Sequence, residues 1–377
     1  MRIAGIMSGT SLDGVDVAVV DITGSGARQR VSPVATGSVP YSGPLRAAIL
    51  AASNAETHTS RIARLNTFLA ETYAAAVRRV CLDHQVPLES LQLAACHGQT
   101  VFHDGHGRRF LGRRTPATLQ LGDGSILAER LEIPVISDFR TRDMAAGGRG
   151  APLVPYLDYF LYADPRLARA ALNIGGIANV TAIPPRASPN DVIAFDTGPG
   201  NMVIDALANR FSKGYARCDR DGRRAARGHP DAAVLRLLLR NPFFRRPPPK
   251  TAGREEFGRE YADRLLATRL APDDLMATAT ALTAASVALG LKNHVPFPIE
   301  ELVASGGGVR NPVLMAHLAA FLPGVRIRTS DEFGVDPDTK EAIAFAVLAY
   351  ESWHRRPSNL PRATGARRPV ILGKLSP

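Results

Sequence analysis

Cysteine is scarce in this sequence, and no long hydrophobic run is present. Only 3 of the 377 residues are cysteines, and Cys81, Cys96 and Cys218 share no C-x-x-C spacing. An odd number of thiols without such spacing argues against a disulfide framework. No run approaches the roughly 18 apolar residues of a membrane-spanning helix, and the apolar stretch after Met1 is too short for a signal peptide. These absences predict a soluble, cytoplasmic protein without a membrane partner.

Aromatic residues are also few, at 6%, although the formal net charge reaches +11. Nearly all of the positive excess is arginine scattered along the chain, and its densest clusters (220–227, 245–246 and 362–368) are expected in loops or in the C-terminal tail. No RNA- or DNA-binding motif accompanies them. The composition therefore predicts no nucleic-acid partner, and anionic ligands that carry phosphate account for the charge.

The length of the chain indicates two domains, because a single typical core is smaller. Hydrophobic content of 45% and charged content of 21% are ordinary for a globular protein. Each half opens with a strand, a glycine turn and a second strand, and then alternates helices with strands. This order predicts an α/β protein of duplicated architecture, with mixed sheets covered by helices and a ligand site in the cleft between the halves. The basic, proline-rich residues after Trp353 are expected to form a surface strand or tail.

Glycine-containing turns follow the first strand of each half. In the first turn, residues 8–16 crowd backbone amides and hydroxyl groups together. Glycine permits close backbone approach, and successive N–H groups form an anion-binding nest, so this turn is either a phosphate loop or an ordinary β-hairpin. Gly175 and Gly176 occupy the equivalent position of the second half, and the two turns together would hold a polyphosphate from both sides. Three glycines at 306–308 would let a flat ring lie against the backbone.

Three aspartates stand beside these turns or at a strand end. Asp196 ends an apolar strand before a glycine-rich helix start, where a partly desolvated carboxylate serves as a general base. The alternative is an Asx turn that stabilises the Thr197-Gly198 bend. Asp13 and Asp16 would hold Mg²⁺ through water, because this ion uses one or two carboxylates and keeps several waters. The alternative for both is a solvated loop.

Histidine and arginine side chains follow other strands of the first half. His97 and His103 flank a glycine-containing loop whose spacing suits no zinc site, so either a polar wall for a substrate or a structural histidine is expected. Arg140, Arg142 and Asp143 follow a strand end and would bind a carboxylate-bearing ligand, because the guanidinium fork suits a carboxylate. A salt-bridged surface loop is the alternative.

Together these motifs resemble those of the anhydro-N-acetylmuramic acid kinases, a family within the sugar kinase/Hsp70/actin superfamily of ATP-binding folds. The resemblance is specific, because the matching segments occur in order over most of the chain. They are GIMSGTSLDGVDVAVVDI (5–22), CHGQTVFH (96–103), LQLGDG (119–124), SDFRTRDMAAGGRGAPLVP (137–155), LNIGGIANVT (172–181), FDTGPGN (195–201), SGGGVRNP (305–312) and DEFGVDPDTKEAIAFA (331–346).

The resemblance implies two actin-like domains, each built on an RNase H-like sheet, over residues 1–168 and 169–377. The two domains would close over ATP and Mg²⁺. It also implies the reaction, in which ATP, water and 1,6-anhydro-N-acetylmuramic acid give N-acetylmuramic acid 6-phosphate and ADP during murein recycling in bacteria. It leaves the oligomeric state open, with a homodimer as one alternative.

The resemblance also assigns roles to particular residues. The residues implied to hold the nucleotide phosphates are Gly9, Thr10, Ser11, Leu12, Asp13, Gly14, Val15, Asp16, Gly175 and Gly176. Asp196 matches the family's catalytic aspartate and would activate the water that attacks the anomeric carbon, which frees the 6-oxygen to take up the γ-phosphoryl group. His97, Arg140 and Glu341 match positions of the sugar pocket. Without the resemblance, Glu341 need only favour the start of its helix.

Some positions depart from the family pattern. Arg149 stands where glutamine is usual, Cys218 where an aromatic is expected, and Ala252 where threonine is usual, so these positions bear on fine contacts with the substrate. Ser8 replaces the aspartate that commonly ends the first strand in the superfamily, which shifts any Mg²⁺ ligation toward the aspartates of the first turn.

Two other functions remain open at this point. A plain hexose kinase would use Asp196 to deprotonate a sugar hydroxyl directly. A nucleotide-driven scaffold or chaperone of the actin/Hsp70 type would need a peptide-binding or polymerising appendage, and the sequence indicates no domain beyond its two halves.

Overall fold

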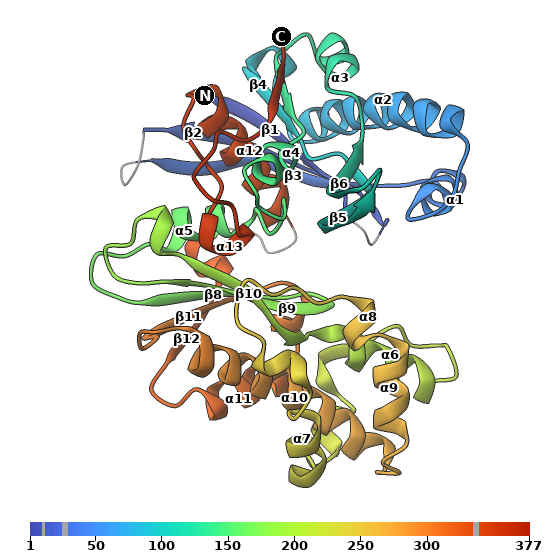
Figure 1. The fold of residues 1–377 in the computed structure, drawn as a ribbon, viewed down its shortest axis with the longest axis vertical. Helices are drawn as coiled ribbons and strands as arrows, with labels where there is room; N and C mark the ends of the chain where they lie inside the picture. Colours follow the sequence, from blue (N-terminus) through green and yellow to red (C-terminus); the bar gives the residue numbers. More distant parts are fainter. Residues whose placement is uncertain (10–11, 25–28, 335–338) are drawn as a thin grey trace. The chain divides into compact units, whose positions relative to one another are not determined.

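The computed structural model describes residues 1–9, 12–24, 29–334 and 339–377 (Figure 1). Contacts within the chain divide it into two compact units, which we call unit 1 (Met1–Phe160 with Thr339–Pro377) and unit 2 (Leu161–Asp338). This division differs from the expected domains 1–168 and 169–377. The difference lies mainly in the segment 339–377, which packs in unit 1.

Unit 1 is built on a mixed six-stranded sheet in the order β13-β7-β4-β1-β2-β3. Strands β1, β2 and β3 are antiparallel neighbours, whereas β4 and β7 continue from β1 in parallel. Because β4 lies parallel to β1, at the far side of β1 from β2 and β3, the chain must cross over the sheet between β3 and β4, and helix α2 lies in this crossover. The strands are β1 (Arg2–Met7), β2 (Gly14–Thr23), β3 (Arg30–Pro40), β4 (Leu93–Cys96), β7 (Val135–Ser137) and β13 (Lys374–Ser376).

The remaining elements of unit 1 are helices and one separate hairpin. The hairpin consists of β5 (Gln99–Phe110) and β6 (Arg113–Leu121). The α-helices are α1 (Gly43–Ala52), α2 (Thr59–Asp83), α3 (Gly124–Leu131), α4 (Thr141–Ala145), α5 (Pro155–Tyr162), α12 (Lys340–Trp353) and α13 (Pro361–Thr364). Helix α5 reaches the boundary with unit 2.

Helices cover both faces of the unit 1 sheet, so its central strands are apolar on both sides. Helix α2 packs an apolar stripe that includes Leu65, Leu69 and Tyr73 on the first face. Helix α12 packs on the other face of β1, so closely that a Cβ at Gly5 would collide with the carbonyl oxygen of Ala342. This close approach of α12 to β1 is the physical reason that the segment 339–377 belongs to unit 1.

The residues after Trp353 were expected to form a surface strand or tail, and the chain does end in β13, an edge strand with two exposed residues. The tail alternative is wrong, because several residues before β13 are buried in unit 1. Strand β13 pairs antiparallel with β7, and Asn359, Thr364 and Leu372 are buried. The segment folds as short pieces that depend on their neighbours in the unit. Such pieces are too short to show a hydrophobic period, which is why the sequence did not indicate that these residues would be buried.

Unit 2 repeats the strand order of unit 1 in a five-stranded sheet, β10-β9-β8-β11-β12. Again three antiparallel strands are followed by two in parallel. The strands are β8 (Arg169–Ile174), β9 (Ile177–Ile183), β10 (Ile193–Pro199), β11 (Glu301–Ser305) and β12 (Arg326–Thr329). The predicted duplicated α/β architecture, with an RNase H-like mixed sheet in each half, is thereby confirmed.

The core helix of unit 2 is α10, which is apolar on every side and buried over most of its length. Among the described residues it is the one helix long and apolar enough to cross a membrane. However, 83% of its most apolar 18-residue stretch is buried inside the protein. It is therefore a core helix. The α-helices of this unit are α6 (Asn201–Phe211), α7 (Ala232–Leu238), α8 (Arg254–Phe257), α9 (Arg259–Leu266), α10 (Pro272–His294) and α11 (Pro312–Phe321).

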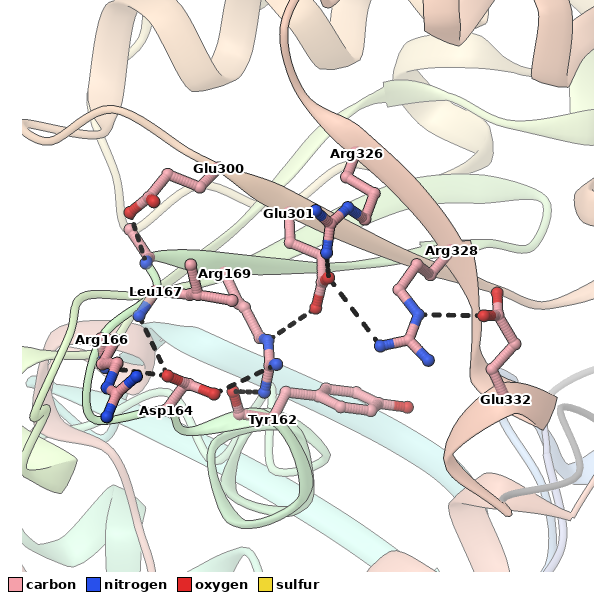
Figure 2. Close-up of polar contacts among 11 residues, drawn as sticks. Tyr162, Asp164, Arg166, Leu167, Arg169, Glu300, Glu301, Arg326, Arg328 and Glu332 are labelled. Carbon is pink, nitrogen blue, oxygen red and sulfur yellow. Dashed lines mark hydrogen bonds and ion pairs between the residues drawn. The ribbon is translucent and has the colours of Figure 1, made fainter.

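An arginine-rich network of ion pairs joins the first residues of strands β8, β11 and β12 (Figure 2). The buried carboxylate of Glu301 lies 2.7 Å from Arg169 Nε and 3.8 Å from Arg328 Nη1. Each arginine also has a second acidic partner. Asp164 lies 3.2 Å from Arg169 Nη2, and Glu332 lies 2.9 Å from Arg328 Nε. Each charge in the buried part of this network thus has a partner of opposite sign, as burial of charge requires.

Candidate active site

The buried His97 and the half-buried Arg140 form a pair at the carboxyl edge of the unit 1 sheet, directly after β4 and shortly after β7. Arg140 donates from Nε and Nη2 to His97 Nε2, at 3.0 and 2.8 Å, and from Nη1 to the carbonyl oxygen of Gly150 at 2.7 Å. Because a guanidinium group has only donors, Nε2 accepts and the imidazole proton lies on Nδ1. Burial, and then the charge of Arg140, hold the pKa of His97 well below its usual value. His97 is therefore neutral, and it also packs on the Phe345 ring at 4.6 Å.

Glu341 and Asp16 complete an electrostatic group around Arg140. Burial lowers the pKa of Arg140 to about 10, against the opposing charges of Glu341 and Asp143. Glu341 lies in the first turn of α12. It is exposed to solvent, although many protein atoms surround its carboxyl group. The surrounding protein atoms raise the pKa of the Glu341 carboxyl group above its usual value. The charge of Arg140 opposes this shift, and the charge of Asp16 adds to it. The structure thus brings together His97, Arg140 and Glu341, the predicted sugar-pocket residues, with Asp16 of the predicted phosphate turn beside them.

Asp143 is fully buried and fixes the loop that carries Gly150. It accepts hydrogen bonds from the Gly150 N–H at 2.8 Å, from Asn359 Nδ2 at 2.8 Å and from Thr364 Oγ1 at 2.7 Å. The expected ligand-binding role for Asp143 and the alternative of a salt-bridged surface loop are therefore both wrong. Its carboxylate instead holds the loop whose carbonyl oxygen binds Arg140, while its neighbour Arg142 is exposed.

The first glycine turn joins β1 to β2, and its Thr10 and Ser11 lie outside the described residues. At its ends, Gly9 accepts hydrogen bonds at its carbonyl oxygen from the Leu12 N–H at 3.3 Å and from Gln99 Nε2 at 3.1 Å. Leu12 is buried with φ at 61°, in the left-handed region that bulky residues seldom adopt. The turn is thus anchored to the start of the β5–β6 hairpin.

The remaining residues of the predicted phosphate turn differ in what they expose. Asp13 is exposed and Asp16 half-buried. Val15 is buried in the sheet, so only its backbone would be offered to a ligand. Gly14 is required by packing, because a Cβ there would collide with the Val39 carbonyl oxygen of β3. Ser8, where the superfamily has aspartate, is buried with its hydroxyl 2.8 Å from that of Tyr73.

The glycine turn of unit 2 has space around both of its glycines. The carbonyl oxygens of Gly175 and Gly176 accept hydrogen bonds from the N–H groups of Asn201 and Gly200, at 2.8 and 2.9 Å, which occupies the start of α6. A Cβ at Gly175 or Gly176 would meet no atom closer than 3.4 Å. Packing therefore does not demand glycine at either position, which agrees with close approach of a ligand.

Two glycines of the triple-glycine run at 306–308 are explained by packing rather than by a ligand. Gly306 has φ at 82°, and a Cβ there would lie 2.6 Å from Asn173 Oδ1. A Cβ at Gly308 would collide with the side chain of Ile174. Only Gly307 has open space, with Asn201 Nδ2 at 3.8 Å. The predicted contact with a flat ring is therefore left to Gly307.

Asp196 lies within β10 in unit 2, at an irregularity of the pairing with β9. Its Oδ2 accepts a hydrogen bond from the Ala252 N–H at 2.7 Å, and its own N–H donates to the Lys250 carbonyl oxygen at 3.1 Å. Burial raises the pKa of Asp196 to about 7, whereas the Ala252 N–H and Lys250 lower it. The carboxylate is bound by a segment 56 residues away, so the alternative of a local Asx turn is not what holds it.

Lys250 is a residue of this site that the sequence did not single out. Its ammonium group lies over the rings of Phe243 and Phe195, at 4.8 and 5.5 Å from their centroids, and donates to the Phe243 carbonyl oxygen at 3.3 Å. Burial lowers its pKa to about 8, and Asp196 raises it. The proline-rich run before it marked an extended loop, but nothing in that run indicated which strand the loop would meet.

Metal ligation has limited support in the described part of the chain. Across residues 1–9, 12–24, 29–334 and 339–377, no group of three or more His, Cys, Asp or Glu side chains could hold a metal ion. His103 instead lies 3.0 Å from the Thr118 hydroxyl. One or two carboxylates are enough for Mg²⁺ when water and phosphate supply its other ligands. The exposed Asp13 and the half-buried Asp16 fit that limited requirement.

The structure shows where the three residues that depart from the family pattern lie. The Ala252 backbone, rather than its side chain, contacts Asp196, so that replacement leaves this hydrogen bond in place. Arg149 donates its N–H to the Thr364 carbonyl oxygen, and its side chain is partly buried. Cys218 is exposed.

The repeated strand order, with a glycine turn after the first strand of each unit, defines the actin-like class of α/β proteins. The chain belongs to the anhydro-N-acetylmuramic acid kinase family, whose sequence profile matches residues 1–377.

Relatives with this name cover nearly the whole chain. The anhydro-N-acetylmuramic acid kinase of Salinibacter ruber is 48% identical over 381 residues, which span 99% of this chain and 96% of that protein. The kinase of the same name from Caldanaerobacter subterraneus subsp. tengcongensis is 42% identical, over 99% of this chain and 96% of that protein. One from Bacillus cereus is 42% identical, over 100% of this chain and 99% of that protein.

Solved structures show a weaker likeness. Component A of (R)-2-hydroxyglutaryl-CoA dehydratase from Acidaminococcus fermentans is 14% identical with a TM-score of 0.47, over 93% of this chain and 98% of that chain. A ROK hexokinase from Thermus thermophilus is 14% identical with a TM-score of 0.38, over 93% and 99% of the two chains. Likenesses at this level add nothing to the family assignment.

Proposed function

We propose that this chain is an ATP-dependent sugar kinase of murein recycling that acts in the cytoplasm. It opens 1,6-anhydro-N-acetylmuramic acid with water and phosphorylates it to N-acetylmuramic acid 6-phosphate. Membership of the family supports the substrate and the reaction. The single observation that carries the chemistry is Asp196, a half-buried carboxyl whose pKa of about 7 suits a general base at neutral pH.

In this reaction Asp196 takes a proton from water as the water oxygen attacks the anomeric carbon. The bond from that carbon to the bridging 6-oxygen breaks, and the 6-oxygen takes up the γ-phosphoryl group as ADP leaves. The Ala252 N–H binds Oδ2 of Asp196 and so orients the carboxylate. That arrangement leaves Oδ1 for the water, and positioning of this kind is the main contribution of a protein to such a step.

The sugar is proposed to bind at His97, Arg140 and Glu341. Three N–H groups of Arg140 are engaged by His97 and Gly150, so two of its five remain for a carboxylate or hydroxyl oxygen of the sugar. The neutral His97 holds the guanidinium plane in position. Glu341 is an acceptor for sugar hydroxyl groups, and its raised pKa reduces the charge it places beside a bound anion.

The backbone of residues 9–16 in unit 1 is proposed to bind nucleotide phosphates. The Gly175-Gly176 turn of unit 2 is likewise proposed to be a phosphate-binding turn. The space around Gly175 and Gly176 supports this role for the second turn. Asp13 and Asp16 would hold Mg²⁺ through water, and the ion would neutralise part of the phosphate charge.

The decisive experiment follows the oxygen of water into the product. Purified protein is given ATP, Mg²⁺ and the anhydro sugar in water labelled with heavy oxygen, and the phosphorylated sugar is analysed by mass spectrometry at early times. We expect one solvent oxygen on the sugar, at the anomeric carbon. A plain hexose kinase would add a phosphoryl group without any solvent oxygen.

Two controls make that result unambiguous. N-acetylmuramic acid 6-phosphate kept in the same labelled water measures the slow exchange of its anomeric hydroxyl, which must stay below the enzymatic signal. A panel of amino sugars without the anhydro bridge should be phosphorylated far more slowly. Absence of product from the anhydro sugar, with any of the other sugars turned over, would contradict the proposed function.

A further inference from the structure

The β5–β6 hairpin ends in an exposed apolar tip. Its two strands form a sheet of their own, apart from the main sheet of unit 1 (Figure 1). We call residues 108–114 the hairpin tip. Phe110 is 65% exposed and Leu111 is 87% exposed, so two large apolar side chains stand in water at the end of the hairpin. Neither is used by the proposed reaction.

The turn at the tip breaks the usual preference for its backbone conformation. Leu111 and Gly112 have φ of 47° and 80°, which places both central residues of the two-residue turn in the left-handed region. Such turns favour Asn, Asp or Gly at both positions, and a leucine there is strained. A Cβ added at Gly112 would meet nothing within 4 Å. The described structure thus offers no packing that would compensate for this strain.

The charge at the tip is also unfavourable within the hairpin itself. Arg109 lies directly opposite Arg114, and Arg113 directly opposite Phe110. Like charges directly opposite each other destabilise a strand pair. Arg108 has a side chain that is 94% exposed, and its nearest carboxylate, that of Asp104, lies 3.7 Å away. Arg114 donates from Nε to the His106 carbonyl oxygen at 2.8 Å, so the hairpin compensates only part of this unfavourable arrangement. A segment that breaks several local rules is expected to serve a function.

The arginines surround the apolar tip on both faces of the hairpin. Residues directly opposite share a face, and successive residues alternate between faces. Arg109 and Arg114 therefore lie on one face, and Arg108 and Arg113 on the other. A linear polyanion such as RNA would need these charges along one face. A planar anionic surface approached end-on meets all four of them, with the apolar residues at its centre.

We propose that the hairpin tip docks on the surface of an anionic phospholipid bilayer. Phe110 and Leu111 enter the boundary between headgroups and acyl chains, and the four arginines bind lipid phosphates. Apolar insertion combined with basic residues is the arrangement by which peripheral proteins bind such surfaces, and arginine suits phosphate because its fork donates two parallel hydrogen bonds. This differs from the expectation, drawn from the sequence, that the protein has no membrane partner.

The test uses full-length protein and sedimentation with vesicles of phosphatidylglycerol and phosphatidylcholine in equal parts. We expect binding at low salt, weaker binding as ionic strength rises, and none to vesicles of phosphatidylcholine alone. The double variant Phe110→Ser/Leu111→Asn should lose binding at least about tenfold, as should Arg109→Gln/Arg113→Gln. Asparagine suits the left-handed turn, so the first variant keeps the hairpin fold, which the rate of sugar phosphorylation checks.

Matched controls remove the same chemistry elsewhere. Leu82→Asn removes another exposed leucine, on α2, and Arg61→Gln/Arg64→Gln removes two exposed arginines of that helix. Both should bind vesicles as the unaltered protein does. Failure of the unaltered protein to bind anionic vesicles, or equal losses in the controls, would overturn the proposal. Binding of single-stranded RNA that the tip variants abolish, without vesicle binding, would assign the tip to nucleic acid instead and would also overturn it.

Discussion

Asp196 combines partial burial with a hydrogen bond that holds only one of its two oxygens. Burial brings its pKa to about 7, whereas an exposed aspartate is ionised well below neutral pH. Near neutral pH about half of the molecules therefore carry the ionised carboxylate that can accept a proton. Lys250, whose own pKa is lowered to about 8, supports the ionised form without forming a close ion pair with it.

The pH dependence of catalysis follows from this pKa. Since the base must be ionised, kcat/KM for the anhydro sugar should rise with pH, by about tenfold per unit below 7, and level off above it. Asp196→Asn should lower turnover about 10²–10⁴-fold, and its residual rate should show no inflection near pH 7. Steady-state kinetics across the pH range check both. A rate for the unaltered protein that is flat from acid to neutral pH would remove Asp196 as the base.

The same raised pKa determines the sign of a stability effect. The folded state holds the proton of Asp196 up to about pH 7, against 3.8 for an ordinary aspartate. The resulting stabilisation is full below the lower value and is lost as pH rises through about 7. Asp196→Asn should therefore increase the free energy of unfolding at pH 8 by an amount on the order of 1 kcal/mol, with a gain that shrinks toward pH 4. Thermal unfolding at both pH values measures it.

Asp143 acts at a distance from the substrate, through the loop that holds Arg140. In Asp143→Asn an NH₂ group replaces one acceptor oxygen, so either the hydrogen bond from the Gly150 N–H or those from Asn359 and Thr364 are lost. A hydrogen bond to a charged group contributes about 1.5–3 kcal/mol. We expect KM for the sugar to rise about tenfold while KM for ATP changes little, as measured by varying each substrate in turn.

The control for this variant is Arg142→Gln, which alters an exposed neighbour on the same short helix. It should leave both KM values unchanged. A rise in KM for ATP equal to that for the sugar in Asp143→Asn would indicate general unfolding rather than loss of position at Arg140.

At the scale of elements, Glu301 links three strands of the unit 2 sheet through ion pairs. It begins β11, and its buried carboxylate neutralises arginines from β8 and β12. Glu301→Gln would leave Arg169 with Asp164 as its remaining acid. Because both arginines keep one acidic partner, we expect a loss of about 2 kcal/mol in the free energy of unfolding, less than the 3–5 kcal/mol typical of a fully broken buried pair. Urea denaturation of unit 2 measures the loss.

Glu332→Gln is the matched control for that network. It removes a charge from the exposed end of the same arginine cluster, where an ion pair contributes about 0–1 kcal/mol. Glutamine can still accept the hydrogen bond from the Thr329 N–H. Equal losses for the two variants would contradict the importance of burial at Glu301.

At the scale of elements, the sequence predicted what depends on local pattern. The two strand–glycine turn–strand units and helix α2 follow from turn residues and hydrophobic spacing, whereas the long helix α10 follows from the length of its apolar run. The sequence placed His97 and Arg140 each at the end of a strand, but only the family resemblance assigned them to one pocket. The structure brings them together because both strands end at the same edge of the sheet. Elements of three or four residues carry no period of their own, so the sequence missed α13 and gave β13 only as an alternative, a surface strand without bounds.

Contacts between distant segments account for what the sequence could not give in the site. Asp143 receives its partners Asn359 and Thr364 from 216 and 221 residues away. Lys250 reaches the site through an irregular loop. Such pairings depend on how whole elements pack, so neither composition nor spacing specifies them. For the same reason Asp143 was predicted as a ligand-binding residue, although it supports the loop behind Arg140.

At the scale of the molecule, unit 1 depends on its C-terminal segment. A chain that ends at Trp353 would lack β13, the buried Leu372 and both side-chain partners of Asp143, Asn359 and Thr364. We expect unit 1 of this truncated chain to lose protection from hydrogen exchange and proteolysis, while unit 2, which keeps its own sheet and core, retains it. Hydrogen exchange read by mass spectrometry resolves the two units in one experiment.

Removal of Pro377 alone is the control for this truncation, because that residue is exposed and follows β13. It should leave the protection of both units unchanged. Full protection of β1, β4 and β7 in the chain that ends at Trp353 would show that the C-terminal segment is dispensable.

The discontinuous course of unit 1 also bears on how a ribosome would deliver this protein. All residues of unit 2 leave the exit tunnel before α12, the helix that covers one face of β1. Nascent chains fold by compact units, and apolar surface left uncovered in the meantime invites aggregation. The earliest-made strands would therefore wait, with one apolar side bare, until translation has nearly ended, and this interval is where a nascent-chain chaperone would be needed.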